Sequence, residues 1–244
     1  MVDLASHAGF KALSMCEGAE GHFAYVDPPF NFNAAGVAKF PPEVTGHFLL
    51  NSLCRRIGWS SLNGRRLLDF GCGVRFARTI VNLAINIGLY AGIDANREAI
   101  SWLQSEIRDP RFRFEHLDML NPMYQANGSS LVDEGALQKF GLADFDAACM
   151  FSVITHQRPN DSGLIFSMLY RCVKPGGSLY FTAFIDETVH DYAEGDPSQP
   201  CLLSTYQPDF LIDLVRKSGW GVEKTYLPSR FQQAAFVCRK PPTD

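Results

Sequence analysis

Five short segments of this sequence combine residue types that can hold a ligand. They are Asp69–Ala77, Asp94, Asp118, Phe151–His156 and Lys174–Gly177. Glycines such as those of Asp69–Ala77 let the backbone turn sharply and approach a ligand closely, and a helix starting there adds oriented N–H donors. A carboxylate at Asp94 can accept hydrogen bonds from both hydroxyls of a ribose. The plain alternative is an ordinary strand–helix turn, with each acid an N-cap or a solvated loop residue.

The elements that must position these segments alternate between apolar strands and amphipathic helices from Arg65 onward. The expected strands are 67–70, 89–93, 112–116, 146–151, 178–184, 220–227 and 231–239. The expected helices are 43–57, 74–87, 96–107, 160–173 and 208–218, with a short one at 134–140. This alternation predicts an α/β doubly wound, mostly parallel seven-stranded sheet covered on both faces. Ligands bind at the carboxyl ends of such strands, so the first four segments, which follow strands, are expected at one edge. Lys174–Gly177 precedes the fifth expected strand and is expected to be a tight turn that leads into it.

The first residues of the chain differ from the rest. Residues 1–43 are predicted to form an irregular N-terminal arm that is a possible lid, and 44–244 a single α/β domain. The arm is rich in aromatic side chains, namely Phe23, Tyr25, Phe30, Phe32 and Phe40.

Composition excludes several classes of protein. The 244 residues carry a formal charge of −4, and 46% are hydrophobic and 20% charged, which excludes a disordered or collagenous chain. The acidic balance argues against a nucleic-acid partner. The longest apolar stretch, 79–93, is interrupted by Asn82 and Asn86 and is too short to span a membrane.

Cysteine usage indicates the compartment. The seven cysteines include no Cys-x-x-Cys pair, and the start of the chain lacks the basic and apolar pattern of a secretory signal. Reduced thiols and a cytoplasmic location are therefore expected. The histidines and cysteines show no metal-ligand spacing, so no metal is expected.

Taken in order, five motifs carry a family resemblance. LLDFGCG, YAGIDAN, FEHLDM, FDAACMFSVITH and KPGGSLYFTAF, with a strand pair at the C-terminus, resemble the class I S-adenosylmethionine-dependent methyltransferases over roughly 65–240. The resemblance implies a Rossmann-like fold, S-adenosylmethionine as cofactor and S-adenosylhomocysteine as product. It favours a small-molecule acceptor of metabolite, lipid or sugar type, and leaves the oligomeric state unknown.

The resemblance also implies a role for each motif residue. Gly71, Cys72 and Gly73 would line the methionine moiety, and Asp69 would orient the loop or the amino group. The other implied contacts are Asp94 with the ribose hydroxyls, Ala95 and Met119 with the adenine ring, Asp118 with the adenine amino group, and Phe151 with the sulfonium end.

His156 is the candidate catalytic residue. It follows the fourth strand, where an acceptor would lie, and an imidazole can take a proton from an alcohol or phenol. The alternative is that His156 caps a helix or packs under the arm. Methyl transfer from a sulfonium depends mainly on in-line placement, so positioning can suffice without a base.

One departure from the family pattern concerns Arg75. Members commonly have a third glycine in the loop, followed by Arg-Phe-Ala, whereas this chain continues from Gly73 with Val74-Arg75-Phe76-Ala77. Either one residue has been lost or Arg75 replaces the glycine. Both readings keep open a catalytically inactive binding or scaffold protein as the alternative function.

Two other readings are disfavoured. Asp27-Pro28-Pro29-Phe30 matches a motif of amino-methylating DNA methyltransferases, but Phe151-Ser152-Val153 occupies that motif's usual place after the fourth strand. A nicotinamide-dependent dehydrogenase would need a small residue where this chain has Phe76.

Overall fold

The computed structural model describes residues 42–119, 135–195, 203–227 and 233–243. The first described element, α2 (Pro42–Ile57), is the helix expected at 43–57. The arm predicted over 1–43, with its aromatic residues and Asp27–Phe30, lies outside the described residues except for the first turn of α2. The division into an arm and a domain at residue 43 therefore stays a prediction.

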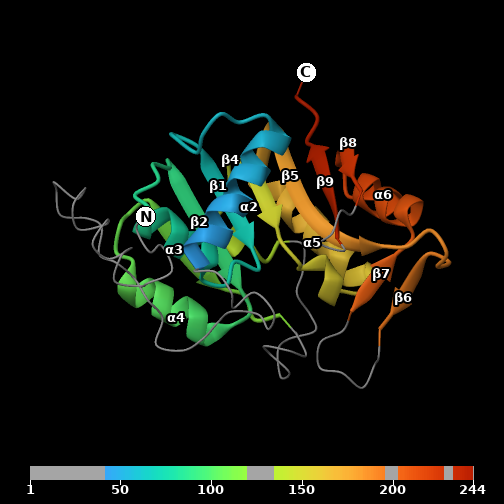
Figure 1. Cartoon of the computed structure of the whole chain (residues 1–244), viewed down its shortest axis with the longest axis horizontal. Helices are drawn as coiled ribbons and strands as arrows, with labels where there is room; N and C mark the ends of the chain where they lie inside the picture. Colours follow the sequence, from blue (N-terminus) through green and yellow to red (C-terminus); the bar gives the residue numbers. More distant parts are fainter. Residues whose placement is uncertain (1–41, 120–134, 196–202, 228–232, 244) are drawn as a thin grey trace, which may run out of the picture.

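The strands form one mostly parallel sheet (Figure 1). They are β1 (Arg66–Phe70), β2 (Leu89–Asp94), β3 (Phe112–His116), β4 (Phe145–Met150), β5 (Val173–Ile185), β6 (Tyr192–Glu194), β7 (Ser204–Tyr206), β8 (Gly221–Tyr226) and β9 (Ala234–Arg239). The parallel order is β3-β2-β1-β4-β5, and antiparallel β9 lies between β5 and β8. The predicted α/β fold with a mostly parallel sheet is confirmed.

The number of strands corrects the prediction, since the sheet formed by the described residues has nine strands rather than seven. All seven expected strands are present, and β6 and β7 are added within the segment expected to be a loop. Thr205 and Tyr206 of β7 pair in parallel with the last residues of β5. A three-residue strand is too short to show an alternating pattern, so the sequence carries no period from which to predict it.

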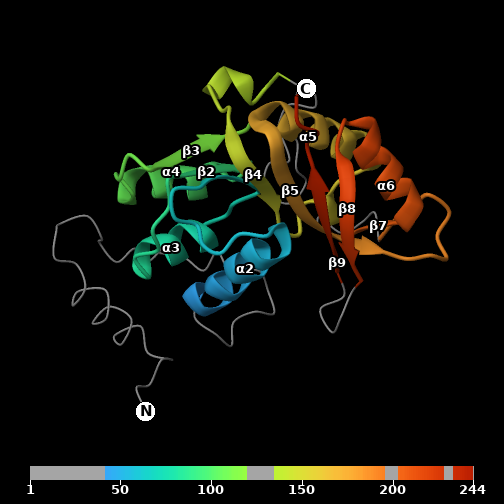
Figure 2. The same ribbon diagram turned by 90° about the horizontal axis from the view of Figure 1, so that it is seen from above.

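Helices cover both faces of the sheet, as Figure 2 shows for α2 on one side and for α5 and α6 on the other. The remaining helices are α3 (Arg75–Asn82), α4 (Arg97–Glu106), α5 (Pro159–Cys172) and α6 (Pro208–Lys217), with short 3₁₀ helices η1 (Gln138–Phe140) and η2 (Ile154–His156). One core joins α2, α3 and α4 to the sheet, and a second joins α5 and α6 to the opposite face.

Helix α3 is shorter than the predicted 74–87. Its apolar pattern continues to Ile87, which is buried, but Ala84 has φ 50° and turns the chain out of the helix. The predicted C-terminal end of this helix is therefore wrong, because an apolar run continues past the turn at Ala84.

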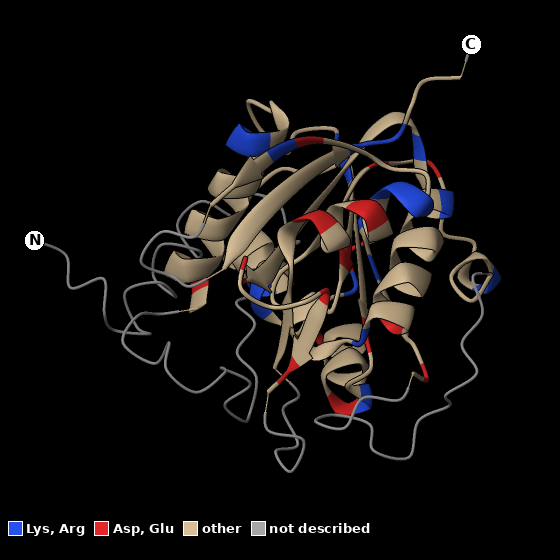
Figure 3. Ribbon diagram, turned by 90° about the vertical axis from the view of Figure 1, so that its right-hand side faces the viewer, with Lys and Arg blue, Asp and Glu red and all other residues tan. Residues whose placement is uncertain are grey.

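In the described part of the chain, no helix is both long and apolar enough to span a membrane. In Figure 3 the described basic and acidic residues are scattered over the ribbon, in keeping with the small net charge.

Candidate functional site

The loop between β1 and α3 is held by the end of β2. Gly71 has φ 75° and Gly73 has φ 48°, both in the left-handed region that favours glycine. The N–H groups of Gly71 and Cys72 donate to the carbonyl oxygen of Ile93, at 2.8 and 3.1 Å. The next N–H group, that of Gly73, donates to Oδ2 of Asp94 at 2.7 Å. Three consecutive N–H groups of the loop are thus bound to the last residues of β2.

The two glycines face different surroundings. A Cβ atom added to Gly71 would lie 2.4 Å from Cγ2 of Val153, in the segment after β4. A Cβ atom added to Gly73 would have no atom of the described residues within 4 Å outside its immediate neighbours. The Cβ direction of Gly71 is therefore blocked by Val153, although Gly71 itself is exposed, whereas the Cβ direction of Gly73 is open among the described residues, so that a ligand can approach the backbone there.

Asp94 ends β2 and accepts hydrogen bonds through both carboxylate oxygens. Besides the bond from Gly73, Oδ1 accepts from the N–H of Asn96 at 2.8 Å. Burial raises the pKa of Asp94, and hydrogen bonds from the backbone of Asn96, Gly73 and Ala95 partly oppose that rise. Asn96 in turn caps α4, because its side chain accepts from the N–H of Ala99 at 3.1 Å.

Ala95 and His116 connect the ends of β2 and β3. His116 Nε2 lies 3.2 Å from the carbonyl oxygen of Ala95, and both residues are half-buried. Ala95, expected beside the adenine ring, is therefore fixed at the same edge as Asp94.

Asp69 lies inside the sheet with 2% exposure. Oδ2 accepts from the hydroxyl of Tyr90 at 2.6 Å, and the thiol of Cys149 lies 3.5 Å from Oδ1. Burial raises the pKa of Asp69 to about 7, although both hydrogen bonds lower it. The register explains the cluster, because Cys149 pairs directly with Asp69 and Tyr90 pairs with Leu67 on the same face.

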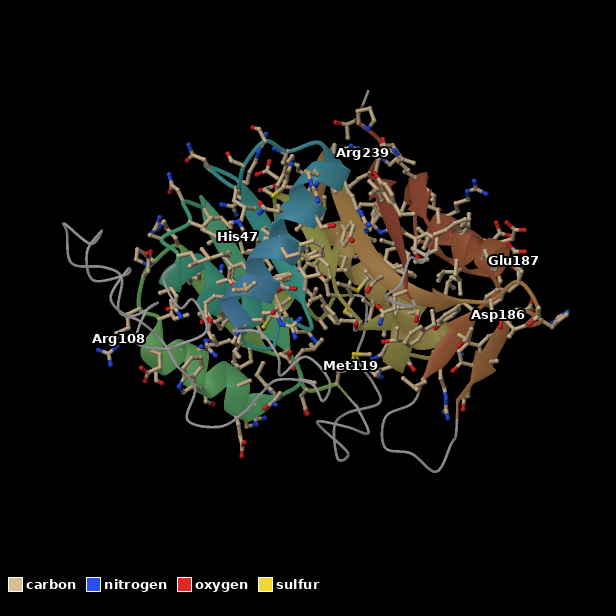
Figure 4. All side chains as sticks on the ribbon, viewed as in Figure 1. His47, Arg108, Met119, Asp186, Glu187 and Arg239 are labelled. Atoms are coloured by element: carbon tan, nitrogen blue, oxygen red, sulfur yellow. The ribbon has the colours of Figure 1, made fainter. Side chains whose placement is uncertain are left out.

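Asp118 and Met119 follow β3. Asp118 is exposed, whereas Met119 is 8% exposed and belongs to the core that includes Phe70 and Ile93. Figure 4 places Met119 at the lower edge of the sheet, well apart from Asp186 and Glu187 on the connection after β5. The two residues expected to bind the adenine thus differ, one facing solvent and the other packed into the core.

Phe151 and His156 follow β4. The Phe151 ring packs edge-on against Phe76 at 5.1 Å and lies 5.1 Å from Tyr180. His156 ends η2, is half-buried, and its N–H donates to the carbonyl oxygen of Val153 at 2.9 Å. The topology places both residues at the carboxyl edge of the sheet.

Ser152 lies between them in a strained conformation. Its φ is 58°, and its N–H donates to Oγ1 of Thr182 on β5 at 2.9 Å. A left-handed residue other than glycine costs about 1–2 kcal/mol, and Thr182 helps to hold it. The segment after β4 is thus fixed to β5.

Arg75 begins α3, and the Cγ atom of its side chain lies near Gly46 of α2. A Cβ atom added to Gly46 of α2 would lie 3.3 Å from Cγ of Arg75. Burial lowers the pKa of Arg75, and the charge of Asp69 opposes that shift. The first part of this side chain therefore packs between helices.

The predicted turn at Lys174–Gly177 takes the form of a bulge within β5. Phe145 pairs with Val173 and Ala147 with Ser178, so the four residues between them have no register partner on β4. Gly176 has φ 73°, and its N–H donates to the carbonyl oxygen of Lys240. This conformation allows the bulge.

Sequence reasoning missed Tyr90, Cys149 and Val153, which fix Asp69 and Gly71. An acid inside the buried run Leu67–Phe70 was the available signal, because a buried carboxyl group needs polar neighbours. Within the described residues, no group of three or more His, Cys, Asp or Glu side chains is arranged to hold a metal ion.

A family model described as a methyltransferase domain matches residues 46–225. This match covers most of the chain, including both sides of the glycine loop and every motif residue.

Several solved structures share the fold. An S-adenosylmethionine-dependent methyltransferase from Mesorhizobium loti has a TM-score of 0.53 at 14% identity, covering 77% of this chain and 96% of that one. The [4+2]-cyclase SpnF has a TM-score of 0.59 at 16% identity, covering 100% and 95%. Magnesium protoporphyrin IX methyltransferase from Synechocystis PCC 6803, with bound S-adenosylmethionine, has a TM-score of 0.52 at 14% identity, covering 88% and 87%.

Likeness to solved structures at these low sequence identities establishes the fold alone. The match to the family model establishes the family. The open glycine loop beside the carboxylate of Asp94 fits the cofactor of that family, S-adenosylmethionine. The chain belongs to the class I S-adenosylmethionine-dependent methyltransferases.

Proposed function

We propose that this protein transfers a methyl group from S-adenosylmethionine to a small-molecule acceptor of metabolite, lipid or sugar type. The observation that carries the proposal is the open side of Gly73 next to Asp94, at the carboxyl ends of β1 and β2. In doubly wound sheets this edge is where ligands bind.

Residues on three strand ends would hold the cofactor. Gly71, Cys72 and Gly73 would line its methionine moiety, and Asp94 would accept from the ribose hydroxyls. The remaining assignments are Asp69 near the amino group, Ala95 and Met119 beside the adenine ring, Asp118 at the adenine amino group and Phe151 at the sulfonium end. Asp69 would act at a distance through the loop, since its carboxylate oxygens face Tyr90 and Cys149.

The cofactor supplies an electrophilic methyl group on a sulfonium. The protein's own contribution is to place the acceptor in line with that group and to exclude water. The π-face of Phe151 attracts a cation, and the packing of its ring against Phe76 and Tyr180 restricts its movement. His156 would take the proton of an alcohol or phenol acceptor.

The acceptor would be selected by the segments 151–158 and 185–206 and by the arm over residues 1–43. The hydroxyl of Tyr206 donates to the carbonyl oxygen of Gln157 at 2.6 Å, which ties β7 to the residue after His156. A rigid connection of this kind supports a defined acceptor site between the two segments.

We also propose that the protein is located in the cytoplasm.

Methyl transfer is tested by incubating the protein with methyl-labelled S-adenosylmethionine and a panel of metabolites. Transfer of label, lost in Asp94→Asn, supports the proposal, and His156→Ala tests the proposed base. The Arg75 departure favours the alternative of an inactive binding or scaffold protein. Cofactor binding without label transfer across the panel, or no binding at all, would favour that alternative.

A further inference from the structure

The carboxylate of Asp94 connects two loops of the protein itself. Oδ2 accepts from the N–H of Gly73 in the loop after β1, and Oδ1 accepts from the N–H of Asn96 at the start of α4. These distances, 2.7 and 2.8 Å, are those of charge-assisted hydrogen bonds. Asp94 is thus part of the structure of the glycine loop before any ligand arrives.

The N–H groups of Gly71 and Cys72 fix the first part of the loop to Ile93, and the bond to Asp94 fixes Gly73 itself. A Cβ atom added to Gly73 meets no atom of the described residues within 4 Å outside its chain neighbours, so no described side chain packs against that side of its backbone. The following residue, Val74, occupies the N-cap position of α3 and makes no side-chain cap hydrogen bond. The bond to Asp94 is therefore the specific contact that orients the Gly73 backbone.

We propose that Asp94 is a positioning residue for the glycine loop, in addition to any contact with the ribose. By holding Gly73, it shapes the loop in advance for the amino-acid end of the cofactor. The inference deepens the proposed function and rests on it, because the loop is assigned there to the methionine moiety.

The first test uses the unliganded protein labelled with ¹⁵N-glycine. The Gly73 amide of the wild type should be protected from hydrogen exchange, and that protection should be lost in Asp94→Ala, which removes both acceptor oxygens. Gly141 is the matched control, because it also has a positive φ, 65°. Its N–H donates to the carbonyl oxygen of Gln138 and so does not depend on Asp94. Its protection should be equal in both proteins.

The second test compares two ligands by calorimetry. S-adenosylhomocysteine and 5′-methylthioadenosine share adenine, ribose and sulfur, and only the first carries the amino-acid group that the loop would line. Asp94→Asn should weaken the first by about tenfold more than the second, the scale of one hydrogen bond to a charged group. Asp118→Asn, at the end of the next strand, should weaken both by the same factor.

An unprotected Gly73 amide in the wild type would overturn the proposal. So would equal losses for the two ligands in Asp94→Asn, because they would reduce Asp94 to a ribose contact. If wild-type protein binds neither ligand, the proposed function fails, while the exchange of Gly73 still decides whether Asp94 positions the loop.

Discussion

The hydroxyl of Tyr90 on β2 donates to Oδ2 of Asp69 on β1 at 2.6 Å, within the sheet and beneath the glycine loop. Asp69 is the acid of the motif LLDFGCG, yet its carboxylate oxygens contact Tyr90 and Cys149 on the neighbouring strands. A buried acid in this position links the stability of the fold to pH.

Stability should fall as pH rises from about 4 to about 7 through Asp69. Its pKa is about 7 in the folded chain against the ordinary value of 3.8, so the native state binds more protons in this window. The slope due to one proton is at most about 1.4 kcal/mol per pH unit. Asp69→Asn should remove this pH dependence. In urea denaturation from about pH 5 to about pH 8, the free energy of unfolding of the variant should therefore rise relative to that of the wild type as the pH increases.

The control is Asp146→Asn. Burial alone would raise the pKa of Asp146, but hydrogen bonds from Lys174 and from the N–H of Arg66 outweigh it and lower the pKa. Asp146 is therefore ionised throughout the same pH range in both states, and its variant should differ from wild type by a constant amount. A constant difference for Asp69→Asn as well would contradict a raised pKa for Asp69.

Gly71→Ala should destabilise the protein more than Gly73→Ala. Both positions have positive φ, which costs alanine about 1 kcal/mol, but only Gly71 faces Val153, at 2.4 Å from an added Cβ. Overpacking adds about 1–3 kcal/mol, measurable by urea denaturation without cofactor. Equal losses for the two variants would show that Val153 does not close the loop.

Substitution at Gly73 should also affect cofactor binding, and not only stability. The open side of Gly73 is where the ligand is expected, so Gly73→Ala should weaken S-adenosylhomocysteine binding although the fold tolerates it. Wild-type affinity in Gly73→Ala would place the ligand elsewhere.

Much of the fold could be predicted from sequence periods. The runs that became β1 to β5, β8 and β9 are long enough to show apolar strand character, and the helices between them show a helical period. β6 and β7 could not be predicted because each has three residues and depends on pairing at the end of β5.

The candidate site was predictable in its motif residues but not in their partners. Gly71, Gly73 and Asp94 stand out by type and by their position after strands. That Tyr90 and Cys149 flank Asp69 depends on the register of three strands, and that Gly73 bonds to Asp94 depends on a loop conformation. Neither is encoded in a local pattern.

Gly46→Ala should destabilise the protein although alanine favours helices. A Cβ atom at Gly46 of α2 would lie 2.0 Å from Oγ1 and 3.0 Å from Cβ of Thr79 on α3, so the helices would have to separate. Overpacking of about 1–3 kcal/mol exceeds the gain of up to about 1 kcal/mol in helix propensity. Thermal unfolding measures the difference.

Gly163→Ala in α5 is the matched control. Within the described part of the chain, an added Cβ there meets only the flexible end of Leu214, at 3.2 Å, so this variant should be neutral or more stable. A stabilised Gly46→Ala would contradict the close approach of α2 and α3.

Glu43→Ala should cost about 3–5 kcal/mol of folding stability. Glu43 and Arg78 form a 2.8 Å ion pair between α2 and α3, with side chains 1% and 4% exposed, and Asn82 donates to the same carboxylate. Removing the carboxylate takes the 2.8 Å ion pair with Glu43 away from the buried charge of Arg78. Urea denaturation gives the loss.

The control is the half-exposed ion pair between Arg239 and Glu223, whose nitrogen and oxygen atoms lie 3.1 Å apart. Solvent screens this pair, so Glu223→Ala should cost about 0–1 kcal/mol. Similar losses for the two variants would mean that burial of the Glu43–Arg78 pair contributes nothing.

The most direct measurement is calorimetric titration of the purified protein with S-adenosylmethionine and S-adenosylhomocysteine, beside Asp94→Ala. Saturable binding of both ligands to wild type, lost in the variant while its circular dichroism stays native, is the predicted result. It would establish that the loop from Gly71 to Gly73 holds the cofactor despite Arg75 at the start of α3. Binding unaffected by Asp94→Ala, or no binding to a folded wild type, would contradict the assignment of this site.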